Sequence, residues 1–147
     1  MYQSTNLSHA DALKIVSAVQ AELEKENRGA AIAVVDAHGE LLAFLRTDGC
    51  KLPSITIAIN KAFTAAREGK ESRAIGDASI KEQFPMTNFG DLRYTAWGGG
   101  VPIKVDGKVV GDLDINSDIE HLGHVSTSPG GMGPLIVRFL IMNFLHI

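Results

Sequence analysis

Hydrophobic side chains recur at helical spacing near the start of the chain. Leu13, Val16 and Leu23 fall on one face of a helix that we expect to run from about Ser8 to Asn27. Ser8 is a suitable N-cap, because its hydroxyl can accept a hydrogen bond from a backbone N–H of the first turn. The pattern therefore predicts an amphipathic helix with one buried face.

Two pairs of apolar runs have the spacing and turn chemistry of β-hairpins. The first pair covers residues 30–35 and 41–45, with turn residues between them. The second pair covers residues 101–105 and 108 to about 115 and flanks Asp106-Gly107. This dipeptide readily adopts the positive φ angles that a tight hairpin turn requires. We therefore expect two β-hairpins, one in each half of the chain.

Between the hairpins the sequence predicts two helices and a loop. Pro53 suits the first turn of a helix that continues to about Glu68, and Ser72 can cap a shorter helix that ends near Gln83. Residues 84–95 lack sustained periodicity and predict a loop. Because strands and helices do not alternate regularly, the order favours an α+β fold, with a mainly antiparallel sheet and packed helices, over a doubly wound parallel sheet.

Length and composition indicate one domain spanning residues 1–147. The chain is 45% hydrophobic, which is enough for a single core. Its net charge is −3 and its Lys and Arg residues are scattered, so we expect no nucleic-acid partner and no binding to an anionic membrane. The single cysteine, Cys50, excludes an internal disulfide and a multi-thiolate metal site. This cysteine usage fits a reducing compartment, so we expect the cytoplasm.

The C-terminal run from Pro134 to Ile147 is strongly apolar but too short to cross a bilayer. The N-terminus has no basic start and no apolar stretch of signal-peptide length, so we expect a soluble protein that is not exported. Residues 135–145 are apolar on nearly every side of a helix. A small domain has little room to bury such a helix, and we therefore predict a homo-oligomer.

The order of several segments resembles one protein family. The segments are Ala33 to Phe44, Arg46 to Cys50, the pattern Ser54, Ala58, Lys61-Ala62 and Thr64-Ala65, Gly98 to Ile103, Asp106-Gly107 and Val110-Gly111. They are similar to the GlcG/HbpS-like haem-binding proteins, also described as the haem-degrading domain family, which include the C-terminal domain of PduO. The resemblance covers roughly three quarters of the chain. It implies an α+β domain of the GlcG-like, profilin-like type.

The resemblance stops at Gly111. Members of the family typically continue the last strand with small residues and then form an acidic, alanine-rich helix. Here Asp112 and Asp114 follow instead, and then a segment that contains His121 and His124. Divergence of this segment and an altered reading frame in the source are both open interpretations. The two histidines, three residues apart, would share a helix face and could bind a transition metal, or they lie in a solvated turn.

The resemblance implies a site for haem or a related tetrapyrrole, with a corrinoid as the second choice of cofactor. A neutral imidazole nitrogen is a good axial ligand for haem iron, and His9 resembles in position an N-terminal haem-contacting histidine of some relatives, so we expect His9 to be the metal ligand. Glycines permit close backbone approach to a ligand, and aromatic rings can stack on a flat macrocycle. The candidate cofactor-binding residues are His9, Phe89, Tyr94, Gly98, Gly99 and Gly100.

Each candidate also has a structural interpretation. A glycine run can form a bend in a strand, aromatic rings can complete a core, and a lone histidine is more often solvated than bound to a metal. Asp36, Asp48, Lys61 and Arg67 are charged residues within the matching segments. A Lys or Arg among them could hold an anionic ligand, or all of them could have ordinary turn and surface roles.

The sequence shows no recognisable catalytic constellation. Cys50 has neither a nearby base nor a positive neighbourhood in the sequence, so we expect an inert thiol. We therefore predict a small-ligand-binding module without catalytic activity. The alternative is an enzyme, or an enzyme accessory protein, that acts on a small oxygenated metabolite, since relatives occur among proteins linked to glycolate and diol metabolism. The physiological ligand and the oligomer size stay open at this point.

Overall fold

The computed structural model describes residue 1 and residues 3–117 of the chain. The elements are α1 (His9–Lys25), β1 (Ala30–Asp36), β2 (Leu41–Arg46), α2 (Pro53–Glu68), α3 (Ser72–Lys81), the 3₁₀ helix η1 (Met86–Phe89), β3 (Val101–Val105) and β4 (Lys108–Ser117). Four strands form one antiparallel sheet in the order β2-β1-β4-β3. The α+β fold with an antiparallel sheet, as expected from the sequence, is confirmed. The predictions for His121, His124 and residues 135–145 lie outside the described residues.

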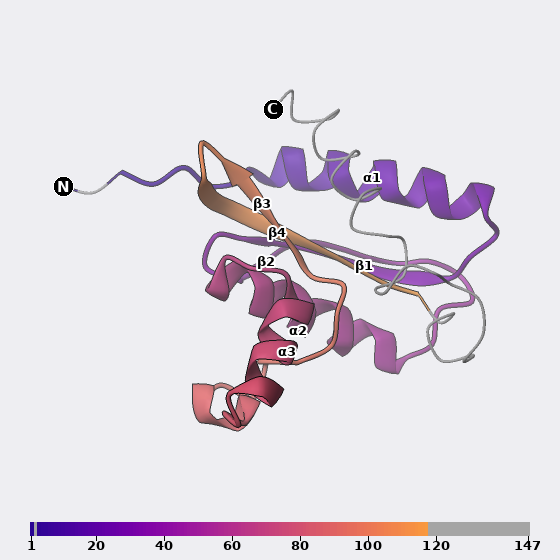
Figure 1. Ribbon diagram of the computed structural model, residues 1–147. Coiled ribbons are helices and arrows are strands. Elements are labelled where there is room, and N and C mark those ends of the chain that lie inside the picture. Colours follow the sequence, from indigo (N-terminus) through magenta and orange to yellow (C-terminus); the bar gives the residue numbers. More distant parts are fainter. Residues whose placement is uncertain (2, 118–147) are drawn as a thin grey trace.

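The sheet separates α1 from α2 and α3 (Figure 1). Alternate side chains of the central strand β1 point to opposite faces of the sheet. Ile32 and Val34 pack in the cluster that contains the buried face of α1, whereas Ala33 and Val35 pack against α2. Because both faces are covered, β1 is apolar at nearly every position and does not alternate between apolar and polar residues.

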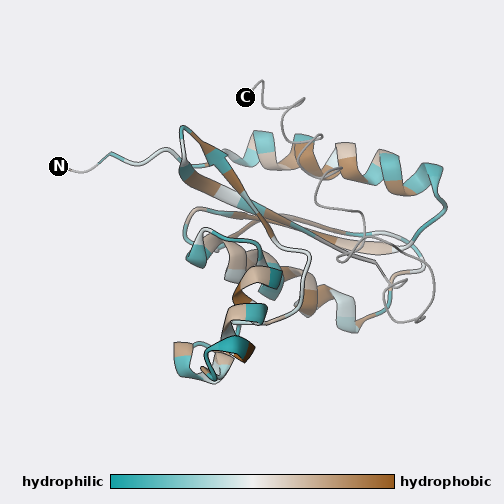
Figure 2. Ribbon diagram, viewed as in Figure 1, coloured by the Kyte–Doolittle hydropathy of each residue, from teal (hydrophilic) through white to brown (hydrophobic). Residues whose placement is uncertain are grey.

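Helix α1 begins where the sequence predicts. The Ser8 hydroxyl accepts a hydrogen bond from the backbone N–H of Asp11 at 3.1 Å, which is the expected N-cap. The helix ends at Lys25, slightly before the predicted end at Asn27, because Asn27 adopts a left-handed conformation with φ of 52°. In Figure 2, hydrophobic and hydrophilic colours alternate along α1, as expected for a helix with one buried face.

The hairpin between β3 and β4 turns at the predicted position. Asp106 and Gly107 have φ angles of 49° and 75°, so both central residues are left-handed, as a type I′ turn requires. Strand β4 then passes between β1 and β3 and becomes a central strand. This placement buries residues of β4 on both faces of the sheet.

The two helices after the first hairpin differ in how well the sequence predicted them. Helix α2 has the predicted bounds, with Pro53 in its first turn and Gly69 in a left-handed conformation at its end. The prediction that Ser72 caps α3 is wrong, because Ser72 is the first helical residue and Glu71 occupies the cap position. The Ser72 side chain is instead bonded to the segment that precedes β3, as described below. Within the described part of the chain, no helix is long and apolar enough to span a membrane.

Candidate ligand site

The run Gly98-Gly99-Gly100 forms a turn that packs closely against α2. A Cβ atom at Gly100 would lie 2.3 Å from the backbone oxygen of Lys61, and one at Gly99 would lie 2.5 Å from the Lys61 Nζ atom. Gly99 also has a φ of 138°, which disfavours any side chain. Glycine is therefore required at this turn for close packing between the backbone and α2. The close neighbour of these glycines in the structure is the chain's own helix α2, and the expectation that they approach a ligand stays a prediction.

Ser72 holds the glycine turn against the start of α3. Its backbone N–H donates to the Gly100 carbonyl at 3.1 Å, and the Gly100 N–H donates to the Ser72 hydroxyl at 3.0 Å. The same hydroxyl donates to the Trp97 carbonyl at 2.7 Å. The amide of Gly100 is thus engaged within the chain, which removes one of the N–H groups that an anion would need in a nest.

A buried ionic group lies beneath the glycine turn. The Lys61 ammonium is 3.2 Å from the Asp114 carboxylate and donates to the Gly98 carbonyl at 3.1 Å, and both charged side chains are almost completely inaccessible, at 1% and 0% exposure. Asp112 is also fully buried on the α2 face, opposite Val35 of β1 and Pro102 of β3. The sheet therefore holds two carboxyl groups and one ammonium in its interior.

The protonation of Asp112 differs from that of an ordinary aspartate. Burial raises the pKa of its carboxyl well above the usual value, and the neighbouring Asp114 carboxylate raises it further. The backbone N–H of Val101 lowers this pKa, but by less than burial and Asp114 raise it. Among the described residues, no hydrogen bond of good geometry reaches either carboxyl oxygen of Asp112. The low solvent access favours the neutral, protonated acid.

The loop between α3 and β3 contributes an aromatic cluster over α2. Phe89 and Tyr94 stack with ring centroids 4.2 Å apart, Phe63 meets Tyr94 edge-on at 5.3 Å, and Phe84 meets Phe89 edge-on at 5.5 Å. The Tyr94 hydroxyl donates to Glu68 at 2.8 Å. Burial and this hydrogen bond raise the pKa of Tyr94 to about 12. Phe89 and Tyr94 are therefore brought together, as expected, but each already stacks on the other.

Arginine side chains border this cluster. The Arg93 guanidinium lies 3.9 Å from the centroid of the Phe63 ring and pairs with Asp91 and Glu40. The hydrogen bonds from Arg93 hold the pKa of Asp91 below its usual value. Arg67 approaches the same ring at 5.1 Å. The ion pair between Arg93 and Glu40 links the loop to the hairpin turn before β2. No local pattern in the sequence predicts this pair, because its two residues are far apart along the chain.

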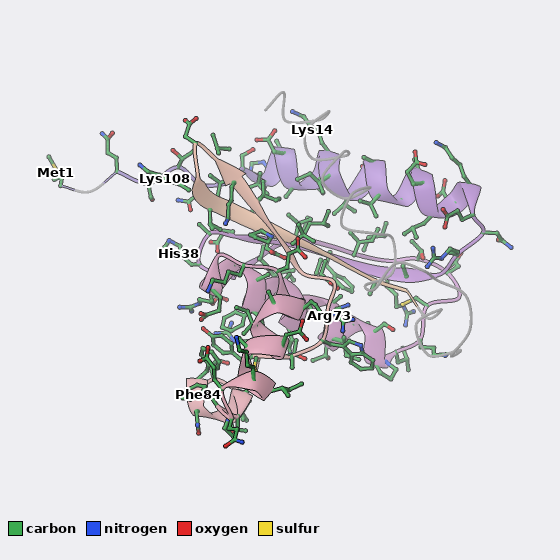
Figure 3. All side chains as sticks on the ribbon, viewed as in Figure 1. Met1, Lys14, His38, Arg73, Phe84 and Lys108 are labelled. Carbon is green, nitrogen blue, oxygen red and sulfur yellow. The ribbon has the colours of Figure 1, made fainter. Side chains whose placement is uncertain are left out.

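His9 lies on the opposite side of the sheet from these groups. It is an exposed residue of the first turn of α1, and Leu13, one turn later, is 57% exposed. In Figure 3, Lys14 marks α1 on one side of the sheet, while Arg73 and Phe84 lie on the other. Within one chain, the structure therefore brings Phe89 and Tyr94 together, packs the glycine turn on the same helix α2, and separates His9 from both groups.

An open groove of about 760 Å³ lies at the far end of α1. It is lined by Gln20 and Glu24 of the helix, by Arg28 before β1, and by Arg46 and Thr47 at the end of β2. The lining is mixed in charge and rich in hydrogen-bonding groups. The groove is suited to a small polar molecule. The sequence analysis noted Arg46 and Thr47 only as part of a segment that resembles the family, and it predicted no groove here.

Among the described residues, the site geometry includes no group of three or more His, Cys, Asp or Glu side chains that could hold a bare metal ion.

Comparison with known proteins identifies the family of this chain. A family model described as "Haem degrading protein HbpS-like" matches residues 7–118. The chain belongs to the HbpS-like family. This result confirms the resemblance that the sequence segments indicated, and the match extends seven residues past Gly111, so that it includes the whole of β4.

Similar proteins support both the family and the fold of this HbpS-like chain. The protein GlcG of Escherichia coli (strain K12) is 34% identical over 116 residues, which are 75% of this chain and 81% of GlcG. The crystal structure of HbpS is similar with a TM-score of 0.77 and 25% identity, over 99% of this chain and 94% of HbpS. A crystal structure described as a PduOC:heme complex has a TM-score of 0.69 and 23% identity, over 76% of this chain and 83% of that one.

Proposed function

We propose that this HbpS-like protein binds haem and that His9 supplies an axial ligand to the iron. The observation that carries the proposal is the exposed position of His9 in the first turn of α1, where its imidazole is accessible to a large ligand. Family membership supports the choice of ligand, as does the similarity in fold to the PduOC:heme complex.

The donor set of the described residues fits haem better than a bare metal ion. A protein site for a bare ion normally needs three or four side-chain ligands close together, and the described residues contain no such group. In haem the porphyrin supplies the equatorial ligands, so that one imidazole is enough for attachment to the protein. His9 provides this imidazole, and the exposed Leu13 on the next turn provides apolar surface beside it.

The aromatic cluster is a separate surface in this proposal. Phe89 and Tyr94 stack on each other, and Tyr94 contacts Phe63 of α2, across the sheet from His9 (Figure 1). A macrocycle attached to His9 of the same subunit would lie on the α1 side. Phe89, Tyr94 and the three glycines would then shape the fold of the loop and would not contact the macrocycle in that subunit.

The test is a titration with haemin followed by absorption spectroscopy. We expect the parent protein to bind haemin saturably with a shifted Soret band, and His9→Ala to change the band position or to weaken binding about tenfold or more. His38→Ala is the matched control, since His38 is also an exposed histidine but lies in the turn of the first hairpin. Phe89→Ala reports separately on the aromatic cluster. Both controls should titrate like the parent.

Three results would overturn this proposal in part or in whole. An unchanged titration of His9→Ala would show that another atom binds the iron. A changed titration of Phe89→Ala with an unchanged His9→Ala would place the ligand at the aromatic cluster. If the parent protein shows no saturable haemin binding, haem is not its ligand.

The groove at the far end of α1 favours a second candidate, a small hydroxy acid such as glycolate. Arg28 and Arg46 both line this groove, and a guanidinium group matches the geometry of a carboxylate. Calorimetric titration with glycolate should show binding that is lost in Arg46→Gln and kept in Arg73→Gln, an exposed arginine on α3. Equal heats for all three proteins would exclude the groove as the binding site.

A further inference from the structure

The glycine turn from Gly98 to Gly100 covers the buried ionic group. A Cβ atom at Gly99 would lie 2.5 Å from both the Asp114 Oδ1 atom and the Lys61 Nζ atom, so the backbone of the turn lies directly on this ion pair. The Lys61 ammonium is 3.2 Å from Asp114 and donates to the Gly98 carbonyl at 3.1 Å. The same ammonium therefore binds the sheet through Asp114 and the turn through Gly98.

The buried group of Lys61, Asp112 and Asp114 is electrically neutral only if one carboxyl keeps its proton. Asp112 lies two residues before Asp114 on β4, so both side chains are on the same face of the sheet, and both are inaccessible to solvent. Lys61 carries one positive charge, which its pairing with Asp114 compensates. A second carboxylate would be an uncompensated buried charge, which is strongly unfavourable. The proton is therefore held at Asp112.

The elements packed around Asp112 do not offer a partner for a second carboxylate. Val35 of β1 and Pro102 of β3 stand opposite Asp112 in the sheet, and neither is charged. Lys61 is the charged residue among the buried side chains of α2, and it is already paired with Asp114. Burial raises the pKa of Asp112, and Asp114 on the same strand raises it further. The closed interior therefore resists ionisation of this carboxyl.

The glycine turn is the part of this interior that can move most easily. Strand β4 is paired on both sides, whereas residues 96–100 belong to no helix or strand. This segment begins after Thr95, whose N–H donates to the Thr64 hydroxyl at 3.0 Å, and ends before Val101, the first residue of β3. The backbone N–H of Val101 interacts with the Asp112 carboxyl, so the charge of Asp112 acts at the end of the turn. Local opening of such a segment costs much less free energy than global unfolding.

We propose that the proton on Asp112 holds the glycine turn closed, and that its loss at higher pH opens residues 96–100 away from α2 while the helices and strands stay folded. Opening admits water to the carboxylates and to the Lys61 ammonium, which solvates the charge that the closed interior cannot compensate. One proton is released for each opening, so the equilibrium constant for opening rises by up to about tenfold for each pH unit. This pH-sensitive switch is independent of the haem and hydroxy-acid proposals, because it uses neither His9 nor the groove.

The first experiment follows the fluorescence of Trp97, the only tryptophan in the sequence, whose carbonyl accepts a hydrogen bond from Ser72 in the closed turn. Quenching by acrylamide is measured from about pH 5 to 9, below the range in which tyrosine ionises. We expect the quenching constant of the parent to rise about twofold or more with pH, while far-UV circular dichroism stays constant. Asp112→Asn should remove this transition. Asp77→Asn, which removes an exposed carboxyl of α3, should keep it, and histidine titration would affect all three proteins alike.

The second experiment measures access to the buried ammonium. A reagent for primary amines is applied briefly at a pH above the fluorescence transition, and peptide mass spectrometry gives the rate of modification at each lysine. Lys61 should react about tenfold or more faster in the parent than in Asp112→Asn at the same pH. The exposed Lys81 on α3 should react equally in both proteins. Quenching of Trp97 that is independent of pH in the folded parent would overturn the proposal. A transition that persists in Asp112→Asn, or equal rates at Lys61 in both proteins, would also overturn it.

Discussion

The buried carboxyl of Asp112 should make this protein less stable as the pH rises. Its pKa is raised in the folded state, mainly by burial, so the folded protein keeps a proton that the unfolded chain releases. The folded state therefore binds more protons than the unfolded state in the pH range between the two pKa values. Stability contributed by this proton is fully present below the ordinary aspartate pKa of 3.8 and is lost as the pH rises toward the folded value.

The perturbation that isolates this effect is Asp112→Asn. Asparagine has nearly the same shape as the protonated acid but does not titrate. A shift of one pKa unit corresponds to about 1.4 kcal/mol, so Asp112 should lower the free energy of unfolding by about that amount for each pH unit between its two pKa values. The substitution should remove this slope. It should cost little near pH 4 and should make the variant the more stable protein at neutral pH.

The assay is urea denaturation followed by far-UV circular dichroism at several pH values from about 4 to 9. Asp77→Asn, which removes an exposed carboxyl on α3, is the control for the general loss of a negative charge. The quantity to compare is the difference in free energy of unfolding between variant and parent at each pH. Parallel curves for the parent and Asp112→Asn would refute the reasoning, because Asp112 would then have the same pKa in the folded and unfolded states.

Two further substitutions test the packing of the site. Gly100→Ala should destabilise the protein by about 1–3 kcal/mol in urea denaturation. The added methyl group would meet the Lys61 carbonyl, so the turn would have to shift. Equal stability of variant and parent would show that the turn is loosely packed. Tyr94→Phe should cost about 1 kcal/mol through the lost bond to Glu68. Because Tyr2 also absorbs, the difference in absorbance between the parent and Tyr94→Phe at alkaline pH should place the pKa of Tyr94 at about 12, and a value near 10 would contradict its burial.

Local features of the sequence determined much of this fold. Pro53 and the residues up to Glu68 predicted α2 with its observed bounds, and Asp106-Gly107 predicted the second hairpin turn. These features depend on the φ angle of one or two residues or on side-chain spacing within one element. Such information is present in a short stretch of chain, so it can be read without knowledge of the rest. The ordered segments up to Gly111 likewise identified the family.

Features that depend on distant partners were not predictable in the same way. Ser72 has the chemistry of a helix cap, but its hydroxyl bonds to Trp97 and Gly100, which lie in a different segment. The topology of the whole chain decides which groups lie next to a given segment. Contacts with these groups easily override the preference of a serine for the cap position, which is worth about 1 kcal/mol. Gly76 of α3 is another residue whose identity depends on a distant partner. A Cβ atom at this position would lie 2.3 Å from the Ala96 carbonyl oxygen, so a larger residue would not fit.

The candidate site shows the same difference between local features and features that depend on distant partners. The sequence determined which residues have suitable chemistry, such as the imidazole of His9 and the rings of Phe89 and Tyr94. Only the tertiary structure decided that the sheet lies between them, because the face on which a helix or loop packs follows from the strand order and not from its own residues. The alternation of Asp112 and Asp114 with apolar residues suits a half-exposed strand. Their burial follows from the central position of β4 under α2, which long-range pairing alone determines.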